Sequence, residues 1–115
     1  MHELSIAMSI VEMAQEEAAA RGNVQIDAVH LRLGKLSGVV KEALLSSYEM
    51  ACETTVLEGS RLVIEEIPVE IFCGKCQLQR PVHSIQLFCC VDCGTPSANV
   101  VRGKELEVFA LEIKD

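Results

Sequence analysis

Residues 73–94 read CGKCQLQRPVHSIQLFCCVDCG and contain five of the six cysteines of the chain. Four of them form two Cys-x2-Cys pairs, Cys73 with Cys76 and Cys90 with Cys93. Tetrahedral Zn(II) takes four thiolate ligands, and each Cys-x2-Cys turn presents two of them to one ion. The spacing therefore predicts a structural zinc site, which is closed by four protein ligands and leaves no open position for catalysis.

The residues themselves leave alternatives to zinc. Paired Cys-x2-Cys turns also hold a single electron-transfer iron in rubredoxin-like proteins, and the thiols could instead stay unliganded or form redox disulfides. Cys89 stands directly before Cys90 and could exchange with it as a ligand, although the spacing Cys90-x2-Cys93 favours a spare thiol at Cys89. Cys52 lies within a helical pattern, which predicts a buried core thiol.

The rest of the chain shows the periodicities of an α+β fold. Apolar residues recur at helical spacing from Leu4 to Ala20 and again from 40 to 54. Alternating patterns predict strands at 24–33, 62–71 and 105–113, with Pro68 interrupting or edging the second one. The third strand changes its alternation near Phe109, which a bulge or a second buried face would explain. The first helical stripe consists of Leu4, Ala7, Met8, Val11, Ala14 and Ala18, broadened by Ile6, Ile10 and Met13.

The order of these elements predicts two helices packed on a three-stranded sheet, with an inserted zinc-ribbon module. We expect residues 1–72 and 97–115 to form one α/β domain, and residues 73–96 to form the insert. The insert has too few apolar residues to fold by itself, so we expect its folding to depend on the metal.

Composition narrows the class of function. The formal net charge of −7 opposes binding to nucleic acid or to an anionic membrane surface. No basic segment precedes an apolar run at the start, and no apolar run is long enough to cross a membrane. Cysteine pairs in such a chain predict reduced thiols and a cytoplasmic protein. Sequence motifs for nucleophilic, phosphate-binding or metalloprotease chemistry are absent, so we expect no enzyme activity.

The second residue is a histidine, and its position gives it a chemistry of its own. The Met1 amine, the backbone nitrogens of His2 and Glu3, and the His2 imidazole can form fused chelate rings around one ion. Nitrogen-rich, square-planar coordination of this kind favours Ni(II) or Cu(II) over zinc. The first amides of a helix have no intrahelical acceptor, so their deprotonation breaks no helical hydrogen bond.

Together these features resemble the HypA/HybF family of hydrogenase-maturation nickel chaperones. The resemblance covers essentially the whole chain and lies in four stretches that occur in the order of the family. These are Met1-His2-Glu3-Leu4-Ser5, the turn Gly34-Lys35-Leu36-Ser37-Gly38-Val39, the run Glu58-Gly59-Ser60-Arg61-Leu62-Val63-Ile64, and the cysteine quartet.

The resemblance implies a nickel-binding domain with a zinc-ribbon insert. By position, His2 with the Met1 amine and the Glu3 backbone would bind Ni(II) as transient cargo, and Cys73, Cys76, Cys90 and Cys93 would bind structural zinc. The family delivers nickel to the large subunit of [NiFe]-hydrogenase with a GTPase partner, and some members also support urease through its accessory proteins. Without the resemblance, two other classes stay open: a zinc-ribbon protein-interaction module that binds no nickel, and a rubredoxin-like electron carrier.

Overall fold

The computed structural model of the chain describes residues 2–114, which fold into two compact units. The helical unit comprises Met1–Leu31, Val39–Glu65 and Glu107–Asp115. The cysteine unit comprises Arg32–Gly38 and Glu66–Leu106. Each unit is described below by itself.

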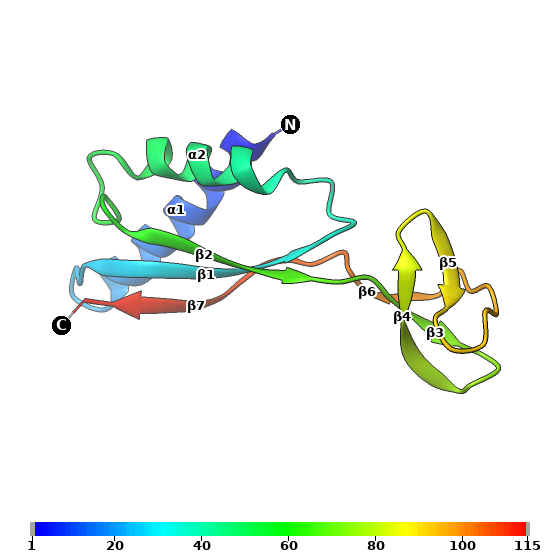
Figure 1. Cartoon of the computed structure of the whole chain (residues 1–115). Helices are drawn as coiled ribbons and strands as arrows, with labels where there is room; N and C mark the ends of the chain where they lie inside the picture. Colours follow the sequence, from blue (N-terminus) through cyan, green and yellow to red (C-terminus); the bar gives the residue numbers. More distant parts are fainter. Residues whose placement is uncertain (1, 115) are drawn as a thin grey trace. The chain divides into compact units, whose positions relative to one another are not determined.

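Two helices, α1 (Glu3–Ala20) and α2 (Lys41–Cys52), form the α-helical layer of the helical unit (Figure 1). Both agree with the predicted helices to within two residues at each end. After α1, Gly22 and Asn23 adopt φ angles of 88° and 63°, and the N–H of Asn23 bonds to the carbonyl oxygen of Ala18. A left-handed Gly and Asn thus end the helix and satisfy one of its last carbonyls.

The predicted three-stranded sheet is present, with the order β2-β1-β7. Its strands are β1 (Ile26–Gly34), β2 (Arg61–Ile67) and β7 (Leu106–Ile113). The predicted strand 62–71 is two strands: β2 ends at Ile67, and β3 (Glu70–Cys73) begins a second sheet beyond Pro68. Proline has no N–H for a ladder, which explains why the interruption falls there.

One hydrophobic core joins the two helices to this sheet. Val108 and Leu111 of β7 both contact the core although they are three residues apart, so the strand breaks strict alternation between them as the sequence suggested. Tyr48 and Cys52 of α2 are buried, and the predicted core thiol is confirmed. The buried residues of this core are Ala7, Ile10, Val11, Ala14, Ala18, Ile26, Val29, Leu31, Leu44, Tyr48, Cys52, Leu57 and Leu62.

The buried stripe of α1 is narrower than its apolar sequence pattern. Leu4 and Met8 are 45% and 57% exposed, and Met13 is 38% exposed, so the expectation that they share the buried face is wrong. Residues along a helix are about 100° apart, which places Met8 roughly a quarter turn away from Ala7. The stripe through Ala7, Val11, Ala14 and Ala18 is made mostly of small residues, and a small side chain lets a helix lie close to its neighbours.

The cysteine unit contains a four-stranded sheet of order β5-β4-β3-β6. Strand β3 pairs with β4 (Leu78–Ser84) on one side and with β6 (Val100–Arg102) on the other, and β5 (Leu87–Cys90) follows β4. Strand β6 lies outside the predicted elements. The predicted insert, residues 73–96, lies wholly within this unit, and the domain boundaries at those residues stay a prediction.

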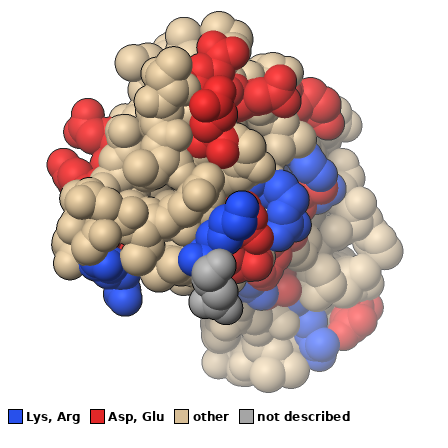
Figure 2. All heavy atoms as spheres, turned by 90° about the vertical axis from the view of Figure 1, so that its left-hand side faces the viewer, with Lys and Arg blue, Asp and Glu red and all other residues tan. Residues whose placement is uncertain are grey.

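Charge is divided unevenly between the two units. The helical unit contains 13 Asp and Glu residues against four Lys and Arg, a formal charge of −9, and the cysteine unit contains four against six, a formal charge of +2. Figure 2 shows acidic side chains gathered on the upper part of one face, the level at which Figure 1 draws α2. The helices of the described residues are too short or too polar to cross a membrane.

Candidate metal centre

Two similar turns carry the two cysteine pairs. Cys73 ends β3, and its carbonyl oxygen accepts a hydrogen bond of 2.8 Å from the N–H of Gln77. Cys90 ends β5, and its carbonyl oxygen accepts one of 2.9 Å from the N–H of Gly94. Gln77 and Gly94 have φ angles of 58° and 77°, so each turn closes through a left-handed residue directly after its second cysteine.

The backbone of each turn also fixes the first cysteine. The N–H of Cys76 points at the Cys73 sulfur at 3.4 Å, which is the hydrogen bond that a thiolate accepts in such turns. The N–H of Cys90 bonds to the carbonyl oxygen of Thr95 at 2.9 Å. Strand pairing thus places Cys73 and Cys90 rigidly, and the short turns bring the second cysteine of each pair back toward them.

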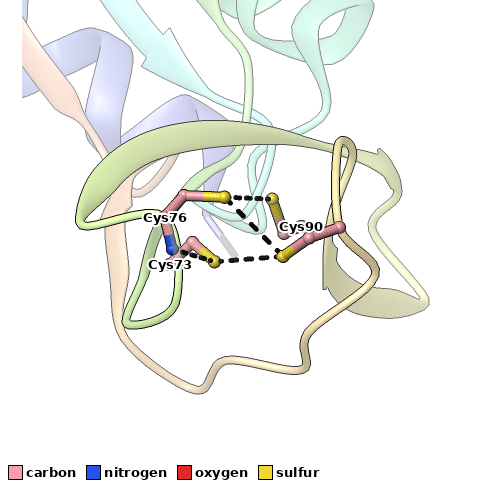
Figure 3. Close-up of side chains that lie close together, drawn as sticks. Cys73, Cys76 and Cys90 are labelled. Carbon is pink, nitrogen blue, oxygen red and sulfur yellow. Dashed lines mark hydrogen bonds between the residues drawn. The ribbon is translucent and has the colours of Figure 1, made fainter.

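The structure brings the four predicted cysteines together. In Figure 3 the sulfurs of Cys73, Cys76 and Cys90 point into one space between the two turns. The Sγ atoms are separated by 3.5 Å between Cys73 and Cys93, 3.7 Å between Cys76 and Cys93, and 3.9 Å between Cys76 and Cys90. All four ligand atoms lie within 4.8 Å of one another, and they are the metal-ligand group found among residues 2–114.

These distances fit one tetrahedral ion. With zinc–sulfur bonds of about 2.3 Å, the sulfurs of a tetrahedral site lie about 3.8 Å apart. Cys73 and Cys90 are buried, at 0% and 2% exposure, whereas Cys93 is exposed. Four thiolates that surround the ion leave no position for a substrate, so the group can hold a metal for structure but cannot present it to a reactant.

The thiols of the quartet differ in their readiness to lose a proton. Hydrogen bonds from the side chain and the backbone of Thr95 lower the pKa of Cys93 to about 6. Hydrogen bonds with the sulfurs of Cys93 and Cys73 raise the pKa of Cys76 to about 12. Near pH 7 the metal-free protein therefore already offers one thiolate at Cys93, while Cys76 gives up its proton only to an arriving cation.

The other candidate ligands of the cysteine unit lie outside this group. Cys89 is half-buried and is not among the four clustered sulfurs. Its backbone pairs with that of Pro96, so Cys89 contributes to strand pairing and not to the group of metal ligands. His83 lies within β4, is exposed, and does not join the cluster.

The candidate nickel ligands stand at the start of α1. His2 is the exposed N-cap residue, and its carbonyl oxygen accepts the first helical hydrogen bond, of 3.0 Å, from Ile6. Glu3 is the first helical residue, and its carboxylate accepts a hydrogen bond of 3.0 Å from the N–H of Val40. That hydrogen bond is the main reason why the pKa of Glu3 is lowered. Met1, the remaining predicted ligand, lies outside the described residues.

Nearly the whole chain matches one protein family. The family, described as "Hydrogenase/urease nickel incorporation, metallochaperone, hypA", matches residues 1–113. The chain belongs to the HypA family. Hydrogenase maturation factor HypA of Roseiflexus sp. strain RS-1 is 47% identical over 115 residues, which are 100% of this chain and 94% of that protein. HypA of Chloroflexus aurantiacus is 48% identical over 112 residues, which are 97% of this chain and 98% of that protein.

Two solved structures have the same fold as this HypA-family chain. One is the solution structure of a HypA protein, with a TM-score of 0.73 and 24% identity over 99% of this chain and 97% of that one. The other is the solution structure of the nickel metallochaperone HypA from Helicobacter pylori, with a TM-score of 0.66 and 24% identity over 98% and 97%. The predicted α+β fold is thereby confirmed.

Family membership also settles the class of function. HypA proteins are metallochaperones that take part in nickel incorporation into hydrogenase and urease. The chain is therefore a maturation factor and not an enzyme. The family resemblance noted from the sequence is confirmed.

Proposed function

We propose that this protein binds Ni(II) at its N-terminus, through the Met1 amine, the backbone nitrogens of His2 and Glu3 and the His2 imidazole, and delivers it for maturation of [NiFe]-hydrogenase. The observation that carries the proposal is the place of His2, exposed at the N-cap of α1. Its imidazole makes no capping hydrogen bond, so it is available to a metal ion.

The start of a helix is suited to binding Ni(II) through backbone nitrogens. The first backbone N–H groups of a helix have no intrahelical acceptor, so amide nitrogens can bind Ni(II) without loss of a helical hydrogen bond. The positive end of the helix dipole opposes a cation, and the negative charge of deprotonated amides offsets that repulsion. The formal charge of −9 on the helical unit attracts divalent cations to it.

We assign Zn(II) to the four-cysteine group as a structural ion. A tetrahedral, all-sulfur site with two buried ligands is typical of structural zinc. The ion would hold the two turns together and contribute on the order of 10 kcal/mol to the folding of residues 73–96. Thiols that have to stay reduced for this purpose favour the cytoplasm as the compartment.

The partners follow from the family and from the charge. We expect a GTPase of hydrogenase maturation and the hydrogenase large subunit to bind the protein, and urease accessory proteins to bind it where urease is served. Opposite charges steer association, so we expect these partners to present basic groups to the acidic helical unit, and we expect binding to weaken with salt.

A nickel titration tests the proposal. Untagged, zinc-loaded protein with its native terminus is titrated with Ni(II) by calorimetry and visible absorption, together with His2→Ala. His83→Ala serves as the matched control, because it removes an exposed histidine that lies outside the proposed site. We expect one equivalent of Ni(II) with a square-planar spectrum in wild type and His83→Ala, and neither in His2→Ala.

Equal nickel binding by wild type and His2→Ala would contradict this site and favour an interaction module that holds zinc alone. Metal analysis of the purified protein separates the remaining alternative. We expect a colourless protein with one zinc per chain, whereas a red, iron-containing protein would indicate rubredoxin-like electron transfer.

A further inference from the structure

Helix α2 begins without a cap from its own sequence. Its N-cap residue is Val40, whose side chain has no hydrogen-bonding group, and no side-chain cap is present. In a capping box, a Glu or Gln at the third helical position accepts the N–H of the N-cap residue. The third helical position of α2 is Ala43, which offers no acceptor. Both halves of the local cap are therefore missing.

Glu3 supplies one missing half from another helix. Its carboxylate Oε2 lies 3.0 Å from the backbone nitrogen of Val40, 37 positions later in the chain. This is the hydrogen bond that the third residue makes in a capping box, formed here between α1 and α2. The carbonyl oxygen of Val40 starts α2 by accepting from the N–H of Leu44 at 2.9 Å, so the capped residue is the true start of the helix.

We propose that the Glu3 carboxylate is a positioning group for nickel. Its hydrogen bond to Val40 ties the nickel-binding terminus to the start of α2, so that nickel binding and this hydrogen bond stabilise each other. The inference rests on the proposed function, because the backbone nitrogen of Glu3 is one of the nickel ligands proposed above. The same residue is then held at its side chain by α2 and at its backbone by the metal.

The anchor reduces the conformational freedom that the terminus loses when it wraps around an ion. Chain termini are mobile unless they are tied down, and ordering a flexible segment weakens binding. Coupling between two equilibria is reciprocal. If the anchor tightens nickel binding, then nickel tightens the anchor by the same factor, and the amide proton of Val40 reports this.

The experiment compares wild type, Glu3→Ala and Glu3→Gln in untagged, zinc-loaded protein. Glutamine retains an oxygen that accepts the Val40 N–H, whereas alanine does not. We expect the Ni(II) dissociation constant of Glu3→Ala to rise about fivefold, as for the loss of one helix cap, and that of Glu3→Gln to stay near wild type. In wild type, hydrogen exchange of the Val40 amide should slow by about the same factor when nickel is added.

Glu42→Ala is the matched control, because it removes a carboxylate from the first turn of α2 and leaves the Glu3–Val40 hydrogen bond in place. We expect its nickel affinity and its Val40 exchange response to equal those of wild type. Equal nickel affinity in Glu3→Ala and wild type would overturn the positioning role and leave the nickel site standing. Absence of His2-dependent nickel binding in wild type would overturn both, because the anchor would then have nothing to position.

Discussion

The hydroxyl oxygen of Thr95 lies 3.1 Å from the sulfur of Cys93, and this contact distinguishes one thiol of the metal centre from the others. A hydroxyl that donates to a thiolate favours the charged form, and the pKa of Cys93 is accordingly lowered to about 6. A group with a lowered pKa keeps its charge until the pH falls through that value, so Cys93 is ionised at neutral pH.

Thr95→Val removes the hydroxyl and keeps a similar shape. We expect the pKa of Cys93 to rise by about 1 to 2, because a hydrogen bond to a charged group contributes about 1.5–3 kcal/mol. A titration of thiolate absorbance in the metal-free protein, from about pH 5 to about pH 9, measures this change in the pKa of Cys93. Thr95→Ser retains the hydroxyl and should titrate as wild type does, and an unchanged titration in Thr95→Val would refute the role of this contact.

The neighbouring cysteines Cys89 and Cys90 should respond differently to the same substitution. Cys90→Ser removes one sulfur of the tetrahedral group, and we expect the zinc affinity to fall by several orders of magnitude. Cys89→Ser leaves the four clustered sulfurs in place and should bind one zinc with the affinity of wild type. Competition with a zinc-binding dye measures both. Loss of zinc in Cys89→Ser would show that Cys89 is the ligand.

Removal of zinc should act on the two units unequally. The helical unit has an aliphatic core of its own, whereas the turns around the cysteines depend on the ion. We expect chelation to increase amide exchange first at residues 73–96 and to leave α1 and α2 protected, since structural zinc contributes on the order of 10 kcal/mol to such a module. Hydrogen exchange with and without a chelator measures this and also locates the boundaries of the insert. Uniform loss of protection would contradict an autonomous helical unit.

Gly34→Ala should destabilise the cysteine unit. A Cβ at Gly34 would lie 2.1 Å from the carbonyl oxygen of Gly103 and 2.6 Å from the backbone nitrogen of Glu105, and backbone atoms cannot move aside as a flexible side chain can. The free energy of unfolding should fall by about 3 kcal/mol, the upper end of the usual cost of overpacking. Gly74→Ala is the control, because a Cβ there meets no atom within 4 Å. Thermal denaturation of both variants measures the difference, and equal melting temperatures would refute the close approach.

Local patterns predicted both helices and the strands of the three-stranded sheet. The spacing of apolar residues, with a period of about 3.6 in helices and about 2 in strands, can be read from the sequence. Gly22 and Asn23, which adopt left-handed conformations, mark the end of α1. The pairing of the cysteines was equally predictable, because two Cys-x2-Cys turns at this spacing have few other uses. In the sequence, Pro68 was the one sign that the predicted strand 62–71 would divide into β2 and β3.

The sequence by itself determined the family, the α+β order of elements and the four sulfurs, since each of these is carried by short-range spacing. Only the tertiary structure decided which apolar residues of α1 are buried, that β6 pairs with β3 through Glu70 opposite Arg102, and that the carboxylate of Glu3 caps α2 at Val40. These relations join residues that are far apart in the chain, at 32 and 37 positions for the last two, and a one-dimensional pattern cannot encode which distant groups meet when a core closes.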